Sequence, residues 1–324
     1  MRSLPLIPVV VTCLLISNGA CATEETPKDT TPAHPAIFAP GVISGPADDA
    51  DAAFAPDGNT VFFARNSTVL VSHKSGSLWS RPQIAPFSGQ WADRQPTMAP
   101  DGSFIVFVSN RPVESGAGTH PAGNLWRVNR QGRGWSEPLH LPATVNSDAS
   151  IWAPSIAGDG SLYFIKKVGP IFRLWRSQYR DGNYEMAVPV SFGDSTTQDV
   201  DPAVAPDESF IVFASMHPGP DQHERLFIAF RATGGWGKPI DLGDAVNGSG
   251  ANDNNEPRLG PDRQTLYFST DHAAAIKFPR TQEQAQKDLE RIQSWDNGSQ
   301  NIWSVTLLPW LNAHSAGDSG GDAS

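Results

Sequence analysis

The sequence predicts an all-β fold, a five-bladed β-propeller of four-stranded antiparallel blades whose ring is closed by an N-terminal strand. Three observations predict it. A short sequence motif, a small residue followed by Pro-Asp-Gly or a near variant, occurs five times. Its aspartates are Asp57, Asp101, Asp159, Asp207 and Asp262. Further strand-like segments follow each copy. Strand-rich repeats with the spacing of these aspartates are typical of propeller blades. The outer strand that the last copy lacks is found near the N-terminus instead.

The repeated motif predicts a tight turn between the first two strands of each blade. Proline presets φ, aspartate can accept a bond from the backbone that follows it, and glycine accepts a positive φ. After the turn, each copy has three consecutive apolar residues, such as Val61-Phe62-Phe63. An unbroken apolar run predicts a strand buried on both faces, as in the middle of a blade. An apolar residue also stands three positions before each repeated aspartate: Phe54, Met98, Ile156, Val204 and Leu259.

Each blade continues with two more strand-like segments. The third strand is expected within residues 68–71, 124–128, 173–176, 225–228 and 301–305. The fourth, often of the form Gly-Trp-x-x-Pro, is expected within residues 78–82, 134–138, 183–189 and 235–239. The stretch from Pro35 to Ser44 resembles these outer strands, so we expect it to complete the fifth blade and remove its exposed edge. The propeller is therefore expected to span residues 36–312.

The repeats resemble those of TolB-type β-propellers. The similarity is carried by Phe107-Val-Ser-Asn-Arg-Pro112, Asn124-Leu-Trp126, Gly134-Trp-Ser-Glu-Pro138 and Val145-Asn-Ser147. The resemblance extends over roughly residues 36–312 and implies the propeller fold, but it implies little chemistry. Members of that family include periplasmic partners of envelope lipoproteins, domains appended to peptidases, and proteins of no known activity. TolB itself has six repeats after a separate domain, whereas five repeats are found in this sequence.

The N-terminal residues predict export. Residues 4–16 are apolar but too short to span a bilayer, and Ala20-Cys21-Ala22 has the form of a cleavage site, so residues 1–22 are expected to be a signal peptide. The alternative makes Cys21 a lipidated N-terminus. Residues 23–35 are expected to form a flexible linker and residues 313–324 a disordered tail. We therefore expect the protein in the periplasm or outside the cell, with or without a membrane tether.

The composition excludes several classes of function. Cys13 and Cys21 are the only cysteines, so the predicted propeller can hold neither a disulfide nor a cysteine-based metal site. The formal net charge is −10, and no basic stripe interleaved with aromatic residues is present, which argues against nucleic acid as a partner. No second apolar segment is long enough for a transmembrane helix.

Acidic residues precede the repeated motif in most copies, at the expected mouth of the central channel. Six positions before the repeated aspartate stand Asp51, Gln95, Ala153, Asp201 and Glu256, and eight positions before it stand Asp49, Asp93, Ile151, Asp199 and Asn254. The first strand of each blade lines the channel, and side chains two positions apart face the same way on an extended strand. We therefore expect up to six carboxylates around one channel mouth, close to Trp91, Arg94 and Trp152.

Three interpretations of these acidic residues stay open. They accept backbone N–H bonds between blades, or they bind a ligand or one axial Ca²⁺ through carboxylate oxygens. In the third, they hydrolyse a glycan, with one acid of raised pKa and one ionised partner. The candidate acid and base groups are then Asp51, Asp93, Asp201 and Glu256. The repetition favours the first interpretation, because catalytic residues are normally unique to one blade.

The loops between second and third strands are expected to form a rim on the same face. They are long in residues 110–123, 216–224 and 271–300. In the longest, Thr281 and Gln284 have the spacing of a capping box, and an apolar stripe that includes Ala285 and Leu289 predicts a short helix. We expect this helix to dock over the rim as a lid.

No single blade supplies a nucleophile together with a base and a residue to orient it. The sequence therefore favours an exported, non-enzymatic binding scaffold, a monomer that needs no cofactor and whose partner is an envelope protein or a glycan. The alternative is a carbohydrate-active hydrolase that uses the axial carboxylates.

Overall fold

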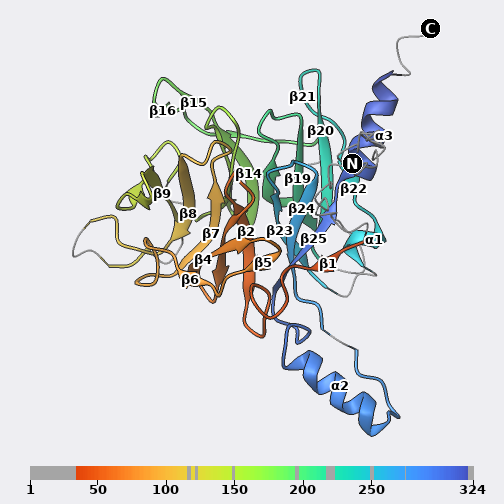
Figure 1. The fold of residues 1–324 in the computed structure, drawn as a ribbon. Helices are drawn as coiled ribbons and strands as arrows, with labels where there is room; N and C mark the ends of the chain where they lie inside the picture. Colours follow the sequence, from red (N-terminus) through yellow and green to blue (C-terminus); the bar gives the residue numbers. More distant parts are fainter. Residues whose placement is uncertain are drawn as a thin grey trace, which may run out of the picture. The chain divides into compact units, whose positions relative to one another are not determined.

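The five-bladed β-propeller predicted from the repeats is present in the computed structural model (Figure 1). The structure describes residues 34–319 except 115–117, 121–122, 148–149, 194–196, 217–222, 249–251 and 274. The predicted signal peptide with Cys21, and all but the end of the predicted linker, lie outside the described residues. No helix in the described part of the chain is long and apolar enough to cross a membrane.

The blades follow one another along the chain, and each is an antiparallel sheet. Blade one contains β2 (Asp49–Phe54), β3 (Thr60–Arg65), β4 (Thr68–Ser75), β5 (Leu78–Trp79) and β6 (Gln83–Ile84). Blade two contains β7 (Asp93–Met98), β8 (Phe104–Ser109), β9 (Asn124–Gln131), β10 (Gly134–Trp135) and β11 (Leu139–His140). Blade three contains β12 (Ile151–Ile156), β13 (Leu162–Val168), β14 (Ile171–Ser177) and β17 (Val188–Pro189), and the small hairpin of β15 (Tyr179–Arg180) and β16 (Asn183–Tyr184) follows β14.

Blade four contains β18 (Gln198–Val204), β19 (Phe210–Met216), β20 (Arg225–Ala232), β21 (Gly235–Trp236) and β22 (Ile240–Asp241). Blade five contains β23 (Asn254–Leu259), β24 (Thr265–Thr270), β25 (Asn301–Thr306) and β1 (Ala36–Ile37). The helices described are α1 (Asp244–Asn247), α2 (Gln282–Ile292) and α3 (Leu308–Ser319).

The first strands of the blades surround the axis. Strands β2, β7, β12, β18 and β23 contact one another in this order, and β23 contacts β2 again. The apolar runs of the second strands are buried as predicted, except that Tyr267 of the fifth run is half-buried; Phe63 and Phe107, for example, have no exposed surface. The core lies between blades, since the cluster around Phe107 also contains Phe62 and Val69 of blade one. Each blade therefore depends on both neighbours to cover its faces.

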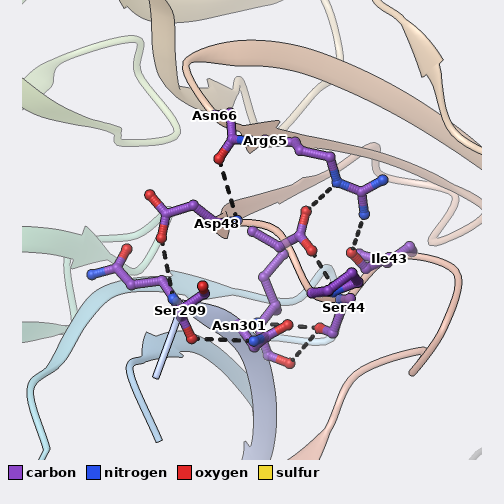
Figure 2. A network of polar contacts seen from close by, with 12 residues as sticks. Ile43, Ser44, Asp48, Arg65, Asn66, Ser299 and Asn301 are labelled. Atoms are coloured by element: carbon purple, nitrogen blue, oxygen red, sulfur yellow. Dashed lines mark hydrogen bonds and ion pairs between the residues drawn. The ribbon is translucent and has the colours of Figure 1, made fainter. Parts of the chain in front are cut away.

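The N-terminal strand closes the ring, as predicted. β1 pairs antiparallel with β25. The Ser44 hydroxyl donates to the Ile302 carbonyl at 3.1 Å and accepts from the Ile302 N–H at 3.2 Å. Farther along, the Gln300 N–H donates to Asp48 at 3.1 Å. Figure 2 shows part of this closing seam, in which residues from the start of the propeller lie beside residues from its end.

The predicted fourth strand is divided in blades one, two and four. In blade one, β5 pairs with the end of β4 and β6 pairs with its beginning, and Pro82 lies between the two short strands. Proline has no N–H to donate and a fixed φ, so it interrupts pairing. Pro138 and Pro239 stand at the equivalent places of blades two and four. The outer edge of these blades is therefore two short strands rather than one.

Helix α2 confirms the predicted helix but not its docking. The capping box of Thr281 and Gln284 is present at its start, yet none of its residues is buried. Leu289 is 47% exposed, and the helix lies away from the blades in Figure 1. Its eleven residues carry only a narrow apolar stripe. Such a stripe offers too little apolar area to offset the ordering that docking requires, so the expectation of a lid over the rim is wrong for this structure.

Helix α3 begins before the stretch predicted to be a disordered tail and continues into it. Leu307 is fully buried, and Trp310 and Leu311 pack against the core cluster that contains Phe230. The His314 ring stacks on Phe230 with ring centroids 3.8 Å apart. These contacts explain why small, polar residues after 312 continue a helix. Residues 320–324 lie outside the described residues.

Candidate functional site

Each innermost strand has a β-bulge six positions before the repeated aspartate. The register between first and second strands shifts there in all five blades. The residues at this position have φ between 50° and 63°: Asp51, Gln95, Ala153, Asp201 and Glu256. Non-glycine residues seldom adopt this conformation, and structures retain it only where the surroundings enforce it. The bulge therefore redirects these side chains away from the regular alternation of a strand.

Side chains at the bulges connect one blade to the next. The Gln95 N–H donates to Asp51 Oδ2 at 3.2 Å, which joins blades one and two. The Ala153 N–H donates to Gln95 Oε1 at 2.7 Å, which joins blades two and three. The Glu256 N–H donates to Asp201 Oδ2 at 3.3 Å, which joins blades four and five. These bonds satisfy buried backbone donors that a regular ladder would leave unpaired between sheets.

The two remaining junctions are connected by residues four positions before the repeated aspartate. Ala153 has no polar side chain, and at the junction of blades three and four the Ser155 hydroxyl instead accepts from the Val204 N–H at 3.0 Å. Between blades five and one, Arg258 Nη2 donates to Asp51 Oδ1 at 2.8 Å. All five junctions around the axis thus have a side-chain hydrogen bond to the neighbouring blade. Asp51 and Asp201 accept a backbone N–H there, as the first interpretation predicted, whereas the remaining contacts come from Gln95, Ser155 and Arg258.

The polar residues eight positions before the repeated aspartate have different partners. They bond within their own blade or to the loop before it: Asp49 to Arg65 and the Gly45 N–H, Asp93 to Arg111 and Ser88, Asp199 to Ser215 and Thr197, and Asn254 to the Asn247 carbonyl. The prediction that both positions share one face, in a ring of six carboxylates, is wrong. The bulge breaks the two-residue alternation on which that prediction rested.

Three carboxylates and one guanidinium instead interact around the axis: Asp51, Asp201, Glu256 and Arg258. Burial raises the pKa of Asp51 to about 6, although the Arg258 charge opposes this rise. Burial also raises the pKa of Asp201. Burial, with the charges of Asp51 and Asp201, raises the pKa of Glu256 well above its usual range. Glu256 Oε2 has no hydrogen-bond partner among the described residues. This environment favours a protonated Glu256.

Glu256→Gln is expected to make the protein more stable at neutral pH and to flatten its stability between pH 4.5 and 7. A carboxyl whose folded pKa is raised contributes stability that is present in full below its unfolded pKa, near 4.5, and is lost as the pH rises toward the folded pKa. The effect is about 1.4 kcal/mol for each unit between the two values. Urea denaturation at several pH values measures it.

The matched control for Glu256→Gln is Glu137→Gln, because Glu137 is exposed on the outer edge of blade two. That change should leave the pH profile as it is in the unchanged protein. If the two variants show the same profile, Glu256 is not the group whose protonation couples to folding.

The aromatic and basic residues predicted at this mouth differ in their surroundings. Trp152 packs against two core clusters, and its indole N–H donates to the Ser150 hydroxyl. A side chain at Gly123, where φ is +75°, would come within 2.9 Å of the Trp152 ring. Trp152 is therefore a packing residue. Trp91 is half-buried, and Arg94 is exposed, with its Nε–H donating to the Ser67 hydroxyl at 2.7 Å.

A second polar group, absent from the sequence-based prediction, lies where blades four and five meet. Gln300 donates to Asn255 Oδ1 at 3.3 Å, and Asn255 donates to Glu224 Oε2 at 3.1 Å. Burial, with the charges of Asp201 and Asp253, raises the pKa of Glu224 to about 7. No sequence signal singled out these residues, because Asn255 falls between the two predicted positions and the others lie in loops.

The structure does not support the axial Ca²⁺. Both Asp51 carboxylate oxygens already accept hydrogen bonds, one from Gln95 and one from Arg258. Calcium requires six to eight oxygen ligands, and an adjacent guanidinium repels a cation. Within the described ranges, no group of three or more His, Cys, Asp or Glu side chains is arranged to hold a metal ion.

Comparisons with known proteins identify the fold. No protein-family profile and no curated protein matches the chain. A structure named as TolB from Agrobacterium tumefaciens is 13% identical, with a TM-score of 0.49 over 81% of this chain and 91% of that one. A thermostable family-43 glycoside hydrolase is 11% identical, with a TM-score of 0.50 over 72% and 86%. An α-L-arabinofuranosidase from Podospora anserina is 12% identical, with a TM-score of 0.44 over 86% and 94%. At these identities the similarity concerns the β-propeller fold alone.

Proposed function

We propose that this protein is an exported, non-enzymatic scaffold that binds an envelope protein through the channel mouth and the loop rim around it. One observation carries the proposal. The axial polar groups are engaged in holding the blades together, since Asp51, Asp201 and Gln95 each accept a backbone N–H bond from the next blade. Side chains whose acceptor atoms join neighbouring blades have a structural role that accounts for their place on the axis. The exposed side chains that could bind a partner on this face are then those of the loop rim.

The rim offers the side chains that protein interfaces favour. Arg94 is exposed and Trp91 is half-buried beside it in the chain, and Trp and Arg are enriched among the residues that dominate binding energy. The segment before α2 adds Phe278, which is 75% exposed, and Ile276, which is 39% exposed. Apolar side chains of this size at the surface are a common feature of interaction sites.

Site-specific photo-crosslinking tests the proposal. A crosslinking residue at Arg94 should capture one envelope protein reproducibly, whereas the same residue at Gln264, exposed on the Pro-Asp-Gly turns at the other end of the innermost strands, should not. Trp91→Ala with Arg94→Glu is expected to weaken binding of the captured protein by about tenfold or more. Capture of nothing above background, or of the same protein from both positions, contradicts the proposal.

A carbohydrate-active hydrolase is the second candidate, and one observation favours it. Glu256 is an acid of strongly raised pKa close to the ionisable Asp51 and Asp201, which is the division of roles that glycoside hydrolysis uses. Sugar release from a panel of polysaccharides and aryl glycosides tests this candidate. Glu256→Gln, which is expected to leave the fold intact, should then lower the rate by about 100-fold or more. Absence of turnover on the whole panel rejects it.

A further inference from the structure

A cavity of about 160 Å³ lies on the axis at the Pro-Asp-Gly end of the innermost strands. All five blades line it, each with residues from the last part of its first strand or the turn that follows. The bulge residues that precede this part of each strand, including Asp51 and Glu256, are not among its lining. The cavity is therefore distinct from the mouth to which the proposed function is assigned.

One layer of this cavity consists of equivalent residues from the five blades. Four positions before the repeated aspartate stand Ala53, Thr97, Ser155, Ala203 and Arg258, and all five line the cavity. Two of them are small, two carry a hydroxyl, and one is a guanidinium. The arginine is thus unique to blade five, at a place where every other blade has a small or hydroxyl side chain.

Arg258 is buried at a cost that its partners only partly offset. The residue is 4% exposed. Its Nη2 donates to Asp51 and its Nη1 donates to the Pro257 carbonyl at 2.8 Å, but its Nε–H has no acceptor among the described residues. Guanidinium has five N–H donors, and Nη1 and Nη2 each make one of these two bonds, so each keeps a second N–H for another acceptor. Unsatisfied donors of a buried charge are costly.

The hydroxyl groups add further donors. Ser155 Oγ accepts from the Val204 N–H, so its own O–H is available to donate, and Thr97 lines the cavity one blade before it. The second charged lining residue is Arg263, near the opening, which pairs with Asp207 at 3.2 Å. Both charged residues of the lining are therefore arginines, and no carboxylate is among them.

The side chains of the other lining residues are apolar, and backbone polar groups are exposed between them. They include the residue three positions before each repeated aspartate, Phe54, Met98, Ile156, Val204 and Leu259, together with prolines of the turns. A cavity of this volume accommodates one ring the size of benzene. The shape and chemistry thus suit a ligand with an apolar body of a few carbon atoms and a single anionic group.

We propose that this cavity is a binding site for a small organic carboxylate, whose anionic group meets Arg258 and the hydroxyls of Thr97 and Ser155 while its apolar body fills the ring of Phe54, Met98, Ile156, Val204 and Leu259. Carboxylate and guanidinium form charge-assisted hydrogen bonds, which are stronger than neutral ones.

Binding of benzoate, compared with neutral benzamide of the same shape, tests the site by NMR titration of the full exported chain. Benzoate should shift the amide signals of Thr97, Ser155 and Val204, and benzamide should bind at least tenfold more weakly because it lacks the charge. Thr97→Val keeps the shape and removes one donor, and should weaken benzoate binding about tenfold. Arg258→Lys, which keeps the charge and loses the planar fork, should weaken it as well.

Thr68→Val is the matched control, because Thr68 is at the start of β4 and does not line the cavity. It should bind benzoate like the unchanged protein. Equal binding of benzoate and benzamide, benzoate shifts confined to other residues, or no binding at tens of millimolar overturns the proposal. In each case Arg258 is a counter-charge for the axial carboxylates and nothing more, and the binding role proposed for the opposite mouth is unaffected.

Discussion

Arg258→Met is expected to lower the free energy of unfolding by about 3–5 kcal/mol at neutral pH, because it leaves a buried carboxylate without its counter-charge. Arg258 Nη2 lies 2.8 Å from Asp51 Oδ1, and the two side chains are 5% and 2% exposed. The arginine also opposes the rise in the pKa of Asp201 and of Glu256. Its removal therefore leaves three acidic groups together without the cation that neutralises them. Denaturant unfolding at pH 7 measures the loss.

The pH dependence and a second substitution identify the cause of this loss. The destabilisation by Arg258→Met should shrink at pH 4.5, where protonation of the acidic groups removes the uncompensated charge. Asp51→Asn added to Arg258→Met should recover a large part of the stability. Arg263→Met is the control, since its ion pair with Asp207 is half-exposed, and it should cost less than about 1 kcal/mol. An equal loss at both pH values would assign the effect to packing of the side chain rather than to its charge.

The fold followed from the sequence because each repeat specifies its own turn and its own buried strand. The motif around Asp101 sets a tight turn, and the three consecutive apolar residues after it indicate a strand that the neighbouring blades bury on both faces. The closing strand was predictable for a similar reason: the fifth repeat lacked an outer strand, and Pro35 to Ser44 had the matching pattern. Local chemistry and global topology agree here, as expected of sequences that fold to one structure.

The geometry of the acidic residues could not be predicted from the sequence, because no local sequence pattern indicates the bulge. A positive φ is usually marked by glycine or asparagine, but here it occurs at Asp51, Gln95, Ala153, Asp201 and Glu256. Contacts between blades enforce it, and those contacts join residues about 50 positions apart. A strand assumed to alternate regularly places Asp49 and Asp51 on one face. The bulge gives them different partners in different blades.

Arg258 could have been identified from the sequence as an exception among the aligned repeats, but its position is not one of those that the repeats share. Aligned on the repeated aspartates, the position reads small or hydroxyl in four copies and arginine in the fifth. A charged residue that replaces a small one in a buried layer requires a partner, and the structure provides it from the next blade in the ring. Comparing repeats position by position for their exceptions therefore finds functional candidates that the shared residues conceal.

Phe38→Ala is expected to destabilise the protein by about 2–4 kcal/mol, because it removes the aromatic side chain that fixes the closing strand. Phe38 packs edge-on against Phe54, Trp79 and Tyr267, with ring centroids 5.6, 5.6 and 5.1 Å away. These contacts join blade five to blade one. Its N–H also donates to the Ile302 carbonyl at 2.8 Å, a bond that alanine can keep. The loss therefore measures packing at the seam rather than strand pairing, and denaturant unfolding quantifies it.

Hydrogen exchange distinguishes local opening of the seam from a uniform loss of stability. In Phe38→Ala, amides of β25 should exchange faster relative to those of β8, in blade two, because β25 would become an edge strand whenever β1 detaches. Phe278→Ala is the matched control, since Phe278 is 75% exposed outside the blades and should change neither stability nor exchange in β25. If β25 and β8 accelerate equally, the ring opens only on global unfolding. The N-terminal strand would then unfold together with the rest of the propeller and would not detach on its own.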